Sequence, residues 1–118
     1  MKPLRAPSLL LVGALLLLLP RTAAAQNGPD GKALYDRLCK SCHGPAGAQP
    51  TPAMVKLMKV QAVTDSAFIT KFSEDSLVTI LEKGTGSKYM KPYAEKMTRE
   101  EMVALVKYLK TFERKSGP

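Results

Sequence analysis

Cys39-Lys40-Ser41-Cys42-His43 is the stretch of this 118-residue chain that decides its fold. These five residues contain both cysteines and the only histidine of the sequence. A zinc site needs four nitrogen or sulfur ligands, and three are too few. A redox-active disulfide between Cys39 and Cys42 is expected in folds that alternate strands and helices, whereas this sequence has no strand-like runs. Neither a zinc site nor a redox disulfide therefore accounts for the motif.

The Cys-x-x-Cys-His spacing is that of covalent haem attachment. In this interpretation the S–H group of each cysteine adds across one haem vinyl group, and the two intervening residues set the sulfurs at the two vinyl positions. The adjoining His43 then reaches the iron, for which imidazole nitrogen is a strong ligand. The sequence predicts one haem c, attached through Cys39 and Cys42, with His43 as the first axial ligand of its iron.

The second axial ligand is not a histidine, because the chain has no other one. Methionine, lysine, tyrosine or an open site remain. Met102 lies on the apolar face of a predicted helix, and Met54 and Met58 are four residues apart on one side of a short one. This spacing predicts that all three methionines pack in the core.

Met90 differs from these methionines because it lies in a loop. Residues 84–93 are punctuated by glycine and proline, which indicates a loop between two helical stretches. Such a loop can bring a thioether to the iron opposite His43 without matching a helical face. Met97 is the main competitor, although its place directly before a helix start also suits a hydrophobic staple. We predict His43 and Met90 as the two metal ligands.

Capping and helix-breaking signals predict an all-α fold with three main helices and short helical turns. The main helices are expected over about residues 30–39, 74–83 and from residue 98 onward, with a short turn at residues 65–70. The start of the last helix is the clearest, because Thr98-Arg-Glu-Glu101 matches the capping box.

The N-terminus has the three-part layout of a secretory signal peptide. Lys2 and Arg5 form a basic start, residues 9–19 form an apolar run, and Ala23-Ala24-Ala25 suits cleavage after Ala25. The apolar run is shorter than the ~20 residues that span a bilayer, which argues against stable membrane insertion. We expect a cleaved signal peptide at residues 1–25, a single domain at residues 26–118, and export to the bacterial periplasm.

The chain is basic, with a formal net charge of +8 at pH 7. Loss of Lys2, Arg5 and Arg21 with the leader lowers this value to +5. The lysines are scattered rather than clustered, and export argues against nucleic acid as a partner. A cationic face for an acidic redox protein is the functional alternative to a merely solvated surface.

Four features in order make the chain resemble class I, mitochondrial-type monohaem c-type cytochromes, in their small bacterial periplasmic form. These features are Gly31 and Tyr35 on a helix leading into the motif, a Gly/Pro-rich loop, Met90-Lys-Pro-Tyr93, and a last helix with Leu105-Val-Lys-Tyr-Leu-Lys110. The resemblance covers residues 28–113 and implies a cytochrome c fold around one covalent haem. It places Gly31 and Tyr35 against Leu105 and Tyr108.

The resemblance also implies a proline carbonyl that accepts the Nδ1–H of the ligand histidine and so fixes its ring. We assign this cofactor-binding role to Pro52, with Pro50 as the alternative. One departure from the related bacterial domains is Lys91, which stands between Met90 and Pro92, where proline often follows the methionine directly.

The predicted function is electron transfer through His/Met-ligated haem between exported or membrane redox partners, with no enzymatic activity. Lys40, Lys88 and Lys91 lie in or beside the ligand segments and are expected to steer an acidic partner. Two alternatives stay open at this point. One is a haem subunit of a larger oxidoreductase, and the other is an open-site haem protein with peroxidase or gas-binding activity.

Overall fold

The computed structural model describes residue 3 and residues 28–116, so the predicted leader and its cleavage site lie outside the described residues. Every regular element in the described part is helical, which confirms the all-α class. The helices are α1 (Gly31–Leu38), α2 (Lys40–His43), α3 (Pro52–Met58), α4 (Ser66–Ile69), α5 (Glu74–Lys83) and α6 (Arg99–Lys110), followed by the 3₁₀ helix η1 (Thr111–Ser116). Within these residues no helix has the length and apolar character of a membrane span.

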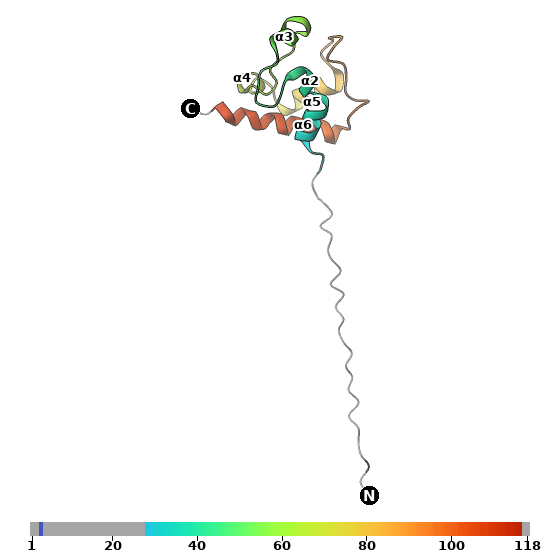
Figure 1. Cartoon of the computed structure of the whole chain (residues 1–118). Helices are drawn as coiled ribbons and strands as arrows, with labels where there is room; N and C mark the ends of the chain where they lie inside the picture. Colours follow the sequence, from blue (N-terminus) through green and yellow to red (C-terminus); the bar gives the residue numbers. More distant parts are fainter. Residues whose placement is uncertain (1–2, 4–27, 117–118) are drawn as a thin grey trace.

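The first and last main helices, α1 and α6, cross in close contact, as Figure 1 shows. A side chain at Gly31 would clash with the carbonyl of Ala104 and would lie 2.8 Å from the Cβ of Tyr108. One helical turn further along α1, the ring centroids of Tyr35 and Tyr108 are 5.9 Å apart. The predicted crossing is therefore confirmed, and glycine is required at its tightest point because any Cβ would separate the two backbones.

The core is formed where α1 and α5 both pack against α6, with Leu34 and Tyr35 as the buried apolar residues of α1. The other two helices contribute apolar residues at helical spacing: Leu77, Val78 and Leu81 from α5, and Met102, Leu105, Val106 and Leu109 from α6. The capping box at the start of α6 is complete, with Thr98 N–H donating to Glu101 Oε2 at 2.8 Å and Glu101 N–H donating to Thr98 Oγ1 at 3.2 Å. The predicted bounds of α5 are confirmed as well.

The short helix α4 confirms the predicted turn at residues 65–70, with Asp65 as its N-cap. Lys110 of α6 fastens the far end of this turn. Its ammonium group donates to the carbonyls of Ile69 and Phe72 and pairs with Glu113. These contacts satisfy a largely buried charge and hold α4 against the C-terminal end of the fold.

The methionines that are buried in the core are not all those that the sequence predicted. Met97 and Met102 are buried in the core, 4% and 2% exposed, and so Met102 is placed as expected. Met54 and Met58 are only half-buried, and α3 contributes no buried residue. Their predicted role as core residues is wrong, because α3 lies at the edge of the fold (Figure 1), apart from the closely packed helices α1, α5 and α6.

Candidate functional site

The Cys-x-x-Cys-His motif folds as a single helical turn, α2, that follows α1 after a break at Cys39. The N–H of Cys39 still donates to Tyr35 O at 2.9 Å, which ends α1. The carbonyl of Cys39 then accepts from the N–H groups of Cys42 at 3.2 Å and His43 at 2.9 Å. Positions three and four apart share one face of a helical turn, so the turn presents both sulfurs and the imidazole on the same side.

The two cysteines are half-buried and form no disulfide with each other. Burial, with a smaller contribution from the neighbouring Cys42, raises the pKa of the Cys39 thiol to about 11. At neutral pH this side chain is therefore the neutral thiol, whereas direct metal binding and disulfide exchange use the thiolate.

The ring of His43 is oriented by a backbone carbonyl. Its Nδ1 lies 2.8 Å from Gln61 O. A carbonyl oxygen can only accept, so Nδ1 carries the hydrogen, and in the neutral ring the lone pair is left on Nε2. That free nitrogen is the atom that an iron ligand must offer.

Gln61 occupies the role that the sequence prediction gave to a proline, so Pro52 and its alternative Pro50 are wrong for this hydrogen bond. Pro52 is the first residue of α3, directly after the N-cap Thr51. Its carbonyl therefore points along the helix axis, as carbonyls of a helix do. Gln61 follows the end of α3, where the chain returns toward α2.

Tyr35 fixes both ends of the motif. Its backbone carbonyl accepts from Cys39 N–H, and its buried hydroxyl donates to Gly44 O at 2.7 Å. Gly44 has φ 84°, a left-handed conformation that lets the chain leave the turn at once. Burial raises the pKa of Tyr35 to about 12, with a smaller contribution from Cys39, so the hydroxyl remains a donor at physiological pH.

The loop that carries Met90 is fastened to the end of α5. Thr85 N–H donates to Met90 O at 3.2 Å, and Tyr93 N–H donates to Leu81 O at 2.8 Å. Gly84 ends the helix with φ 72°, and a Cβ there would lie 2.8 Å from Met90 O. The half-buried side chain of Met90 packs against the core.

One hydrogen bond connects this loop to the motif. The hydroxyl of Tyr93 donates to Leu38 O at 3.4 Å, one residue before Cys39. In the view of Figure 1, α2 lies between α3 and the loop of residues 84–93. The fold thus brings the motif and the Met90 loop together, while Met97 stays in the core.

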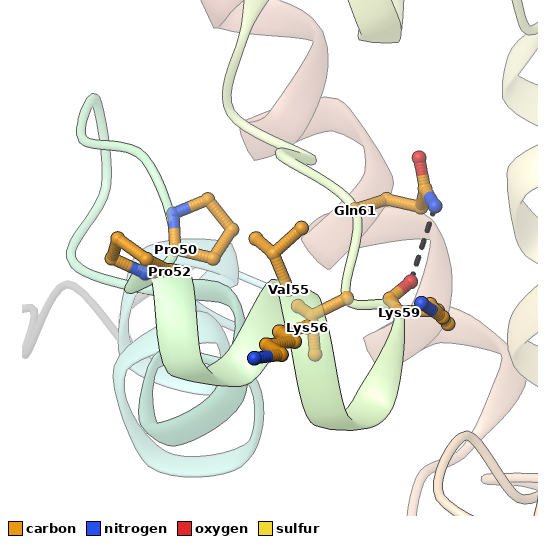
Figure 2. Close-up of a pocket in the computed structure, with 7 residues that line it drawn as sticks. Pro50, Pro52, Val55, Lys56, Lys59 and Gln61 are labelled. Carbon is orange, nitrogen blue, oxygen red and sulfur yellow. Dashed lines mark hydrogen bonds between the residues drawn. The ribbon is translucent and has the colours of Figure 1, made fainter.

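An open pocket of about 500 Å³ adjoins the residue that orients His43. Figure 2 shows this pocket beside α3, with Gln61 on the irregular segment that follows the helix. Apolar side chains, two lysines and one amide side chain line it: Pro50, Pro52, Val55, Lys56, Lys59, Val60 and Gln61.

The donor set of this region fits a covalently held haem. Two thiols lie one helical turn apart, and the adjoining imidazole has a free Nε2 because Nδ1–H is bound to Gln61 O. A half-buried thioether lies on a loop that is tied to the same segment. Cys39 and Cys42 could attach the porphyrin, and His43 and Met90 could supply the axial atoms.

Comparison with known proteins agrees with this donor set. The sequence profile of the family described as cytochrome c matches residues 29–113, and the chain belongs to the cytochrome c family. Among solved structures it is similar to KustC0563, a c-type cytochrome from an anammox bacterium, with 33% identity, a TM-score of 0.60, and coverage of 72% of this chain and 99% of that one. A mutant of that cytochrome aligns with 31% identity and a TM-score of 0.59, over 70% of this chain and 98% of that one. The search of curated proteins found no match.

Proposed function

We propose that this protein is an electron carrier that holds one haem c through Cys39 and Cys42, with His43 and Met90 as axial ligands. The observation that carries the proposal is the hydrogen bond from His43 Nδ1 to Gln61 O, which leaves Nε2 available within the attachment motif. When bound, the haem iron supplies reversible one-electron exchange between its ferrous and ferric states.

The assignment of Met90 rests on the positions of the other methionines. Met97 and Met102 are enclosed in the core, and Met54 and Met58 lie on the peripheral helix α3. The loop that carries Met90 is held by the hydrogen bonds from Thr85 N–H to Met90 O and from Tyr93 N–H to Leu81 O. The hydroxyl of Tyr93 also binds the carbonyl of Leu38, the residue before the motif. A thioether is a soft ligand that favours ferrous iron and so raises the reduction potential.

We expect both axial positions of the iron to be filled in the purified holoprotein. The oxidised form should show the weak far-red band that an iron–methionine bond gives, and it should bind cyanide slowly and reduce peroxide only marginally. Optical redox titration with a parallel peroxide assay checks this expectation. A high-spin spectrum with rapid peroxide turnover would contradict the carrier function and favour an open-site haem protein.

The leader of residues 1–25 supports export, and we place the mature carrier in the bacterial periplasm. Its partners on this proposal are redox proteins with acidic docking faces. Lys40, Lys88 and Lys91 are exposed in or next to the two ligand segments. The ammonium of Lys88 lies 4.9 Å from the ring centre of Tyr89, which is itself 48% exposed. An exposed aromatic ring with a cationic rim is a common anchor in protein interfaces.

Replacing Lys88 and Lys91 together by glutamine is expected to slow oxidation by ferricyanide about threefold at low salt. The loss should shrink as the salt concentration rises, because screening weakens the attraction of the anionic oxidant. Stopped-flow kinetics measure both effects. Glutamine at Lys71 and Lys107, two exposed lysines on other segments, is the matched control. Equal rates for both double variants, or a rate that does not depend on salt, would contradict the proposal that Lys88 and Lys91 form a docking face.

A further inference from the structure

The backbone between α3 and the Gln61 carbonyl makes a tight left-handed turn. Lys59 ends α3 with φ 56° and ψ 35°, and its N–H donates to Val55 O at 3.0 Å. It is the only non-glycine residue with positive φ in the part of the chain that the structure describes. Residues other than glycine adopt this conformation seldom, so the turn needs other contacts to hold it.

The side chain of Gln61 supplies one such contact. Its Nε2 donates to Lys59 O at 3.1 Å, the dashed bond of Figure 2. The exposed amide thus reaches back over two residues and closes the turn from outside. This contact fixes the peptide group of Lys59 relative to that of Gln61, and therefore the direction in which the Gln61 carbonyl points.

The Gln61 carbonyl has two donors. It accepts from His43 Nδ1 at 2.8 Å and from Val63 N–H at 3.0 Å. A carbonyl oxygen has two lone pairs, and both are engaged when the oxygen is aimed between these donors. A rotation of the peptide that moved the oxygen toward Val63 N–H would lengthen its bond to His43. The alignment of the histidine bond is therefore sensitive to how firmly the turn is held.

We propose that the Gln61 side chain is a positioning residue for His43, acting through its hydrogen bond to Lys59 O. The inference rests on the proposed ligation of haem iron by His43. A hydrogen-bond acceptor on Nδ1–H makes the imidazole a more basic ligand and fixes its ring angle. A more basic ligand stabilises ferric iron, so the amide of Gln61 holds the reduction potential lower than an unclamped turn would.

Gln61→Met tests the proposal, because methionine has a similar length and no charge but cannot donate to Lys59 O. The exchange of the Nδ1 proton of His43 with solvent, followed by NMR in the reduced holoprotein, should become about fivefold faster, as expected for loss of one hydrogen bond. The midpoint potential should shift upward, and the haem content should stay that of the wild type.

Gln49→Met is the matched control. Gln49 is also exposed, and its amide donates to Asp65 Oδ2 at 2.8 Å. This variant should keep the proton exchange rate and potential of the wild type. Unchanged exchange and potential in Gln61→Met, or equal changes in both variants, would overturn the positioning role. Absence of covalent haem from the wild type would instead refute the proposed function itself.

Discussion

Replacing Gly31 by alanine is expected to destabilise the holoprotein by about 3 kcal/mol, at the upper end of the cost of overpacking. The new Cβ would meet the Ala104 carbonyl and the Cβ of Tyr108. Neither atom belongs to the flexible end of a side chain, so α1 and α6 must move apart. The higher helix propensity of alanine offsets only about 1 kcal/mol of this cost. Thermal unfolding should show a Tm lower by roughly 10–20 °C.

Gly28→Ala is the control for this prediction, because a Cβ at Gly28 would have no atom within 4 Å. Its Tm should stay close to that of the wild type. Equal Tm values for Gly31→Ala and the wild type would show that α1 and α6 do not approach at Gly31, and the described crossing would be wrong.

Replacing Met90 by alanine is expected to remove the second axial ligand and leave the haem attached. Loss of the soft thioether should lower the midpoint potential and abolish the far-red band of the oxidised protein. Added cyanide or imidazole should then bind at least about tenfold more tightly, because it no longer competes with an internal ligand. Spectroscopic titration of the purified variant measures all three changes.

Met97→Ala separates ligation from packing. Met97 is 4% exposed within the core, and truncation of a buried methionine costs about 2–5 kcal/mol. This variant should therefore melt earlier and keep the wild-type spectrum. If Met97→Ala loses the far-red band and Met90→Ala keeps it, the assignment of Met90 is wrong.

The helices could be predicted because their signals are local. Asp30, Ser73 and Thr98 each accept hydrogen bonds from N–H groups in the first turn that follows them. Such caps act over three or four residues, so they can be read without knowledge of the fold. The crossing of α1 and α6 is different, because Gly31 and Ala104 are far apart in sequence, and its prediction came from the resemblance to a family.

The partner of His43 could not be predicted from residue types, because every residue carries a backbone carbonyl. The Gln61 carbonyl is selected by the place where α3 ends and by the left-handed turn at Lys59. Neither the length of α3 nor its exit angle is encoded by a motif of the kind that marks Cys39 or His43. Pro52 was a wrong choice for this reason. It follows the motif at a plausible distance in sequence, but its carbonyl points along α3 and not toward His43.

The methionines of α3 show a limit of helical periodicity. Met54 and Met58 have the spacing of a buried face, and the predicted helix is present. Periodicity identifies which side chains share a face, but it does not say whether another element covers that face. In the described residues they are half-buried at the edge of the fold, which only the tertiary arrangement reveals.

The most direct test of the central claim is the intact mass of the protein after denaturation, for the wild type and for Cys39→Ala/Cys42→Ala, both expressed with the machinery for haem attachment. We expect the wild type to carry the mass of one haem, to show a c-type absorption spectrum and to have lost residues 1–25. The double variant should carry none. A wild-type mass equal to that of the bare polypeptide, or haem that remains bound to the double variant after denaturation, would contradict covalent attachment at Cys39 and Cys42.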